Sequence, residues 1–247
     1  MEGTAVPRRL TWEVATVSAA MPETPSVRTI GLDVPSWPGH RAGQHLDVRL
    51  TAEDGYSAER SYSIAAAADD PVAITVERLD DGEVSSYLTE DLRVGDQLEI
   101  RGPVGGYFVW ETADGGPLLL IGGGSGIVPL RAILRQREHS GSHVPVRLLY
   151  SARALPELIY RDELDGYRDG VEIMYTLTRE QPAGWTGYAR RVDRALLAET
   201  AWPAEKNPLA FVCGPTDFVE TVAGELVALG YEPGRVKTER FGGIGGR

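Results

Sequence analysis

Eight residues in the middle of the chain, Gly122 to Pro129, have the composition of a phosphate-binding turn. They follow the continuous apolar run 117–121, typical of a strand buried on both faces, and precede a segment with helical spacing. Glycine lets the backbone approach a dinucleotide closely, and the N-terminus of the following helix favours its phosphates. Pro129 stands where the Rossmann form of this motif has Gly or Ala. A glycine-rich turn without a ligand is the alternative.

A second candidate phosphate site lies in the first half of the chain, at Gly82-Glu83-Val84-Ser85-Ser86. We predict Ser85 as the N-cap of a helix, which would leave the amides of residues 84–86 facing outward. Unpaired amides at a helix N-terminus attract a diphosphate. A capped helix without a ligand fits the pattern equally well. Upstream, the segment Arg60-Ser61-Tyr62-Ser63 taken alone is typical of an ordinary strand with polar residues outward.

Polar residues also end the predicted strands of the second half. Ser151 and Arg153 follow one strand, Arg179 follows another, and Cys213-Gly214-Pro215 follows a third. In a parallel sheet, ligands bind at the carboxyl ends of the strands. The two arginines are therefore candidates for holding a phosphate, although solvated surface arginines are common. A lone buried cysteine usually has a packing role only.

The elements that would position these residues change character at mid-chain. Strand patterns at 11–17, 27–32, 45–50, 61–65, 72–77 and 97–100 are separated by Gly and Pro, with one short helix near 84–92. They predict a closed antiparallel β-barrel. After a linker at 112–116, strands at 117–121, 146–150, 171–176, 209–212 and 235–238 alternate with helices near 128–137, 157–164, 192–199 and 216–229. This alternation predicts an α/β doubly wound parallel sheet. We therefore predict two domains, residues 1–112 and 113–247.

Four segments, taken in order, resemble the ferredoxin–NADP reductase-like flavoprotein family: Arg60 to Ser63, Gly122 to Pro129, Cys213 to Pro215, and Glu239-Arg240-Phe241. The first is similar to the family's R-x-Y-S motif, and Gly124 to Pro129 is similar to its G-x-G-x-x-P motif, which accounts for the proline. Segments 82–88 and 102–108 are similar to two further family motifs. The resemblance extends from about Leu10 to Phe241. It implies a flavin-binding barrel followed by a domain that binds a nicotinamide nucleotide.

For the flavin, the resemblance implies that Arg60 neutralises the pyrophosphate, Tyr62 lies against the flavin, and Ser63 lies near N5, the atom that receives hydride. Phe241 would stack on the flavin, with simple core packing as its alternative. FAD is favoured over FMN, because only a pyrophosphate uses both Arg60 and the amides around Ser85. The predicted flavin-binding residues are Arg60, Ser61, Tyr62, Ser63, Val76, Arg78, Gly82, Val84, Ser85, Ser86 and Phe241.

For the nucleotide, the resemblance implies that Cys213 borders the nicotinamide ring and positions it, without acting as a nucleophile. Glu239 would help to order the site, so Ser63, Cys213 and Glu239 are the predicted catalytic residues. Arg153 and Arg179 would hold a 2′-phosphate, which favours NADPH over NADH. The predicted nucleotide-binding residues are Gly123, Gly124, Ser125, Gly126, Ser151, Arg153, Arg179, Cys213, Gly214 and Pro215, and no metal site is predicted.

The function implied is that of an FAD-dependent NAD(P)H oxidoreductase. Hydride from NAD(P)H would reduce flavin N5, and electrons would leave for a separate acceptor, a ferredoxin or oxygenase component. One alternative is a reductase with free flavin, a quinone or another small acceptor. Another is a non-catalytic flavin-binding subunit that relays electrons within a larger complex. The sequence has one cysteine, so it contains no cysteine-ligated iron–sulfur domain. An acidic ferredoxin would require a basic rim around the flavin.

The composition is that of a soluble globular protein, with 247 residues, 42% of them hydrophobic and 25% charged. The formal net charge of -11 argues against nucleic acid and anionic membranes as partners. Residues 1–20 show no apolar leader, and no run is long enough to span a bilayer. We expect a cytoplasmic protein that is a monomer.

Overall fold

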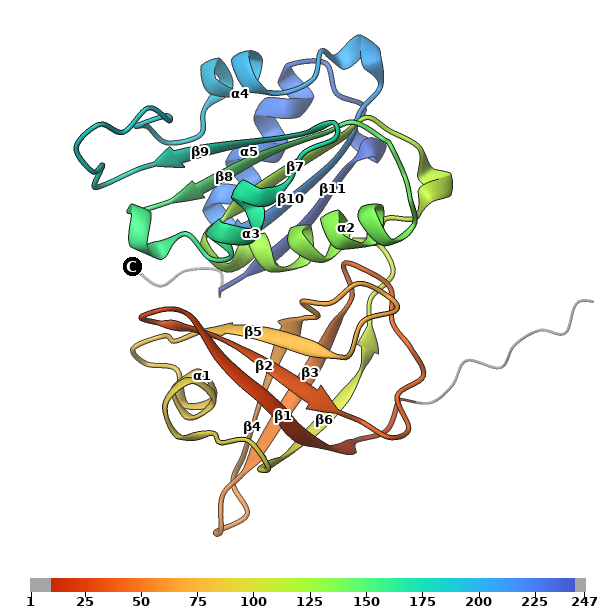
Figure 1. Ribbon diagram of the computed structural model, residues 1–247, viewed down its shortest axis with the longest axis vertical. Helices are drawn as coiled ribbons and strands as arrows, with labels where there is room; N and C mark the ends of the chain where they lie inside the picture. Colours follow the sequence, from red (N-terminus) through yellow and green to blue (C-terminus); the bar gives the residue numbers. More distant parts are fainter. Residues whose placement is uncertain (1–9, 243–247) are drawn as a thin grey trace, which may run out of the picture.

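The computed structural model describes residues 10–242, so part of the N-terminal segment considered above lies outside the described residues. Figure 1 shows two bodies stacked on each other, with a β-barrel below and a layered α/β unit above. Within residues 10–242, no helix combines the length and apolar character needed to cross a membrane.

The lower body is the predicted antiparallel barrel. Its strands are β1 (Glu13–Thr24), β2 (Val27–Asp33), β3 (His45–Thr51), β4 (Ser57–Ser63), β5 (Ala73–Glu77) and β6 (Gln97–Val104), in the order β4-β3-β6-β1-β2-β5. An antiparallel bridge between Ile64 and Ile74 joins the two outer strands and closes the barrel. β4 begins four residues before the predicted strand at 61. Residues 57–60, of which only Ala58 is apolar, pair with β3 through their backbone and give little apolar signal.

Alternating side chains fill the barrel interior. Residues such as Val17, Ile30, Leu46, Val48, Ile74 and Ile100 are almost fully buried there. A short helix, α1 (Glu83–Ser86), continues into a π-helical turn at Tyr87–Asp91. Its buried residues Val84 and Leu88 join the same core. The helix therefore lies against the barrel and brings the Gly82 segment close to β4.

The upper body is the predicted parallel sheet, with β7 (Leu118–Gly123), β8 (Val146–Ala152), β9 (Val171–Leu177), β10 (Leu209–Pro215) and β11 (Val236–Phe241) in the order β11-β10-β7-β8-β9. The helices are α2 (Ile127–His139), α3 (Arg161–Gly166), α4 (Arg194–Thr200) and α5 (Thr216–Ala228). α2 and α3 cover the side of the sheet that faces the barrel, and α4 and α5 cover the other side (Figure 1). α3 begins later than predicted, because Leu155–Glu157 forms a separate 3-10 turn and Tyr160 has a left-handed backbone, with φ 60°.

The two bodies share one apolar cluster. Ala65, Phe108 and Trp110 from the barrel side belong to the same buried cluster as the α2 side chains Ile127 and Leu130. Polar contacts lie around it: the Lys237 ammonium donates to the Val109 carbonyl at 2.8 Å. The barrel and the sheet are therefore packed directly against each other.

Candidate functional site

The glycine-rich turn lies where the direction of the sheet winding reverses. β7 and β10 are neighbours, and Gly122 pairs with Cys213 across them. A methyl group built on Gly126 would stand 2.2 Å from the carbonyl oxygen of Cys213, so only glycine fits there. Gly124 has φ +54°, a backbone conformation that favours glycine, and a methyl group built on it would be in ordinary contact with the Glu77 carboxylate, at 3.9 Å. The turn and the first residues of α2 thus form a glycine-lined cradle at the switch point of the sheet, the place where such folds bind nucleotides.

The predicted phosphate arginines lie side by side at the next two strand ends. The Arg179 amide donates to the Arg153 carbonyl at 2.9 Å, just beyond β8 and β9. Both arginines are exposed. Within the part of the chain that the structure describes, neither guanidinium has an ion-pair partner, and Glu180 does not pair with Arg179. Ser151 pairs with Gly123 in the sheet register, which links this edge to the cradle.

The flavin motif lies on the last residues of β4. Tyr62 is half-buried and packs on the barrel core, and burial raises the pKa of its hydroxyl to about 12. Arg60 is exposed, and among residues 10–242 its guanidinium donates only to the neighbouring Glu59 carbonyl, at 2.7 Å. The Ser61 hydroxyl donates to Asp47 at 2.6 Å on the outside of the barrel. Arg60 and Tyr62 are two residues apart and so share one face of the strand. The ring and the cation are both available to a ligand on that face.

The prediction that Ser85 caps a helix is wrong. Gly82 is the N-cap of α1, and Ser85 lies buried in the first turn. The Ser85 hydroxyl donates to the Gly82 carbonyl at 3.0 Å and accepts from the Leu79 amide at 3.1 Å, so it stabilises the turn before the helix. The Ser86 amide also bonds to Gly82, at 2.8 Å. Amides free for a phosphate are therefore those of residues 83–85, one position earlier than predicted.

Two other predicted flavin residues have contrasting positions near this turn. Val76 is fully buried in the barrel core, so its side chain is not available to a ligand. Arg78 follows β5 and is exposed, and its guanidinium pairs with Glu90. A flavin contact at Val76 would therefore have to use the backbone.

A contact between the two bodies unites the three predicted catalytic residues. The Ser63 hydroxyl, at the end of β4, donates to Glu239 Oε1 at 3.3 Å. Glu239 lies on β11 directly opposite Cys213 on β10. Burial raises the pKa of Glu239 to about 7, and the Ser63 hydrogen bond opposes only part of that rise. Burial also raises the pKa of the Cys213 thiol, as does the nearby Glu239 carboxylate. A neutral thiol is a poor nucleophile, in keeping with a positioning role for Cys213.

The end of β11 lies beside the same place. In the register of β10 and β11, Gly214 lies opposite Arg240, and Pro215 lies opposite Phe241. The Phe241 side chain is 36% exposed, which excludes simple core packing. Among the described residues, no group of three or more His, Cys, Asp and Glu side chains is placed to hold a metal ion.

Several residues near the site carry no local sequence signal. The carboxylate of Glu77, at the end of β5, lies 3.9 Å from a methyl group built on Gly124. Phe218 of α5 lies against Gly123, 3.0 Å from a built methyl. Both belong to elements distant in sequence from the cradle, so only the folded structure brings them there.

Two family models match this chain. The oxidoreductase FAD-binding domain matches residues 15–109, and the oxidoreductase NAD-binding domain matches residues 120–224. A glycine betaine monooxygenase reductase subunit from Chromohalobacter salexigens is 31% identical over 82% of this chain and 56% of its own length. The ferredoxin reductase component of a 3-ketosteroid-9-alpha-monooxygenase from Rhodococcus rhodochrous is 32% identical over 94% of this chain and 66% of its own. The chain thus spans well under the full length of these relatives.

A solved structure shows the same two-body arrangement. The FAD/NAD-binding domain of a nitric oxide dioxygenase from Vibrio cholerae superposes with a TM-score of 0.83 at 26% identity, covering 94% of this chain and 99% of that one. The barrel, the cradle at the switch point of the sheet and both family models indicate the same pair of domains. The chain belongs to the ferredoxin–NADP reductase-like family of flavoprotein oxidoreductases, with an FAD-binding domain followed by an NAD-binding domain.

Proposed function

We propose that this chain is a reductase unit that takes hydride from NAD(P)H and passes electrons to a separate oxygenase or ferredoxin-like component. The observation that carries the proposal is the Ser63–Glu239 hydrogen bond. It brings the end of the flavin strand to the switch point of the nucleotide sheet, where Cys213 and the glycine cradle lie. Two substrates that must react with each other need such a shared site.

The residues present fit both groups. The glycines of the Gly124–Gly126 turn, which let a ligand approach the backbone where α2 begins, suit a diphosphate. The half-buried ring of Tyr62 suits a flavin, and the exposed Arg60 beside it suits a pyrophosphate. FAD, when bound, accepts a hydride from the nicotinamide and gives up its electrons singly. In this proposal, Ser63 and Glu239 hold the hydrogen-bonding edge of the flavin, and Cys213 limits where the nicotinamide can lie.

Two observations bear on the electron acceptor: the names of the relatives and the net charge of the barrel domain. Both relatives described above are named as reductase parts of oxygenase systems, so an oxygenase component or its ferredoxin is the proposed partner. Residues 10–112 hold 18 Asp and Glu against seven Arg, whereas residues 113–242 hold 17 acidic and 15 basic residues. The barrel therefore carries most of the negative charge and has no basic excess of its own. An acceptor that docks on the barrel is expected to present a basic face to it.

NADPH is the proposed coenzyme, because two exposed, unpaired arginines lie together at the strand ends next to the cradle. A monomeric state is proposed as well. One alternative keeps the same chemistry but uses a free flavin or a quinone as acceptor. The other is a subunit that binds flavin without reacting with NAD(P)H, and the intact glycine turn, in which Gly126 leaves no room for a side chain, argues against it.

The test is anaerobic mixing of the FAD-loaded protein with NADPH and with NADH, followed by loss of the visible flavin absorbance. Reduction by either coenzyme supports the reductase function, and the faster one identifies the coenzyme. If neither reduces the flavin, the proposal is wrong and the relay alternative takes its place. Reoxidation by ferredoxins, free FMN and a quinone, compared at equal concentrations, then separates the two reductase possibilities.

A further inference from the structure

A buried arginine on α2 reaches out of its own domain. Arg131 is only 8% exposed, and charged side chains are seldom so buried without partners. Its Nη1 donates to the Ala65 carbonyl of the barrel at 2.7 Å. Its Nη2 donates to Glu163 of α3 at 2.6 Å. Glu163 also binds Arg135, and burial opposes but does not overcome the lowering of its pKa by these two arginines. The guanidinium is thus fixed at one end by an ion pair and bonds to the barrel at the other.

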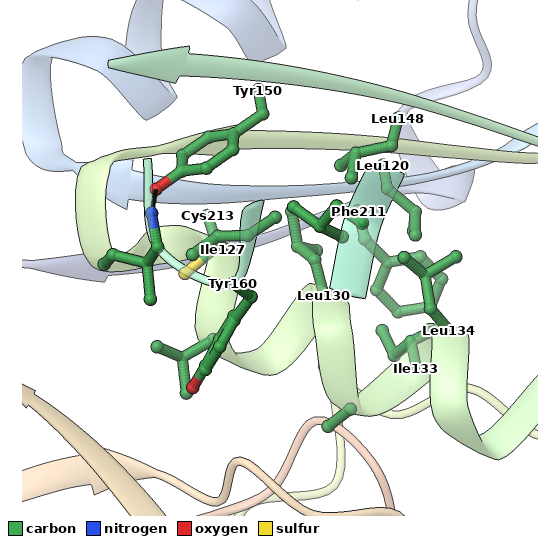
Figure 2. Close-up of a cluster of buried hydrophobic side chains, with 14 of the residues drawn as sticks. Leu120, Ile127, Leu130, Ile133, Leu134, Leu148, Tyr150, Tyr160, Phe211 and Cys213 are labelled. Atoms are coloured by element: carbon green, nitrogen blue, oxygen red, sulfur yellow. Dashed lines mark hydrogen bonds between the residues drawn. The ribbon is translucent and has the colours of Figure 1, made fainter. Parts of the chain in front are cut away.

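A tyrosine crosses the interface beside it. The Arg131 guanidinium lies 4.3 Å from the centre of the Tyr160 ring. The buried Tyr160 hydroxyl donates to Thr75 on β5, and Thr75 shares a hydrogen bond of 2.8 Å with Thr29 on β2. Figure 2 shows the Tyr160 hydroxyl directed away from the sheet, toward the barrel strands. Both side chains therefore leave the α/β body together and end on barrel atoms.

The two ends of these contacts belong to the two binding segments. Ala65 lies two residues after Ser63, where the flavin strand joins β5 through the Ile64–Ile74 bridge. α2, which carries Arg131, begins directly after the Gly124–Gly126 turn. The contact from Arg131 to Ala65 therefore ties the helix behind the nucleotide cradle to the end of the flavin strand.

We propose that Arg131 and Tyr160 are positioning residues that set the distance between the nucleotide cradle and the flavin strand without touching either group. The inference rests on the proposed function. Hydride transfer requires reacting atoms roughly 3–3.5 Å apart, and a misplacement of about 1 Å is costly. An apolar contact would join the domains at less desolvation cost than a buried charge. Directional bonds from a rigid guanidinium fix a geometry that apolar packing leaves adjustable.

The test compares Arg131→Gln and Tyr160→Phe with a matched control, Arg137→Gln. Arg137 lies on the same helix and is 5% exposed, but it donates to the carbonyls of Val144 and Asp169 within its own domain, at 2.7 and 2.8 Å. In the flavin-free protein, calorimetry reports whether the two domains unfold together. We expect Arg131→Gln to split one unfolding transition into two. We expect Arg137→Gln to lower the temperature of the single transition without splitting it.

In the FAD-loaded protein, the limiting rate of flavin reduction at saturating NAD(P)H is the second measurement. We expect Arg131→Gln to lower it about tenfold or more, with unchanged FAD content and nucleotide Kd. Tyr160→Phe, which keeps the ring, should lower it less, and Arg131→Lys should recover part of the rate. Reoxidation of the dithionite-reduced protein by ferricyanide should be unchanged, because it does not involve the nucleotide.

The inference is overturned if Arg137→Gln slows reduction as much as Arg131→Gln does, or if Arg131→Gln leaves the limiting rate unchanged. A parent protein that NAD(P)H does not reduce would instead contradict the proposed function. In that case the calorimetric comparison still decides whether Arg131 couples the domains.

Discussion

Glu239 is a carboxylic acid held largely out of water where the two domains meet, and its titration can be measured through stability. Burial raises its pKa from the ordinary value of 4.5 to about 7. The folded state therefore favours the protonated form. At 1.36 kcal/mol for each pH unit, this difference corresponds to at most about 3 kcal/mol between the two protonation states.

The sign follows from proton binding. Between about pH 4.5 and pH 7, the unfolded chain has lost this proton while the folded chain still holds it. The free energy of unfolding that this group contributes therefore decreases as the pH rises through that window, and it is constant above it. Glu239→Gln replaces the acid with a neutral group of the same shape. We expect the variant to gain stability relative to the parent by up to about 3 kcal/mol between about pH 5 and pH 8.

Urea unfolding of the flavin-free protein at several pH values across this range is the assay. Glu205→Gln, which removes the carboxylate of an exposed glutamate outside the domain contact, is the matched control. If the difference between Glu239→Gln and the parent is constant with pH, the carboxyl of Glu239 titrates normally. The argument that burial dominates at this contact would then be wrong.

Four further predictions test other parts of the site. Gly126→Ala should destabilise the protein by at least about 2 kcal/mol, because its methyl would meet the Cys213 carbonyl at 2.2 Å, whereas Gly166→Ala, which meets nothing within 4 Å, should change the urea midpoint little. Arg60→Ala should lose FAD on gel filtration, and stoichiometric FAD in that variant would show that another residue holds the pyrophosphate. Arg153→Ala and Arg179→Ala should each lower kcat/KM for NADPH by a factor that corresponds to about 2 kcal/mol, and leave kcat/KM for NADH nearly unchanged. Equal losses of kcat/KM for the two coenzymes would remove the support for NADPH. Electron transfer to cationic cytochrome c should slow as salt is added and that to anionic ferricyanide should quicken, since the barrel is acidic; no response to salt would contradict this.

The sequence predicts most of the architecture because its strongest signals are local. Glycine and proline mark the ends of short strands, and the apolar run before Gly122 is that of a central parallel strand. The two sheets follow from these patterns, whereas the strand order and the pairing of Gly122 with Cys213 come from the structure. The same local signals place Ser63 and Glu239 only at the ends of strands. Their contact depends on how two domains pack, which no pattern within either domain encodes.

Ser85 and Arg131 show what residue type alone does not predict. Ser85 has the residue type of an N-cap, but its hydroxyl bonds to the turn that precedes the helix, because Leu79 and Gly82 fold back over it. Arg131 has no special local context, since an arginine in an amphipathic helix is normally exposed. Its burial follows from the Ala65 carbonyl that the barrel presents to α2. The position of Ser85 is therefore decided by bonds within its own turn, and that of Arg131 by a contact between the two domains.

The two side-chain contacts near the reacting groups differ in how they respond to protons. The bond from Arg131 to the Ala65 carbonyl contains no carboxyl group, so it is independent of the titration of Glu239. Glu239 changes from acid to carboxylate near pH 7, but Ser63 is the donor in their hydrogen bond, and a carboxylate accepts it at least as well. Raising the pH therefore lowers the stability of this contact through desolvation without removing its geometry. The spacing of the two binding segments should accordingly hold across neutral pH, with Arg131 as the fixed contact and Glu239 as the one that titrates.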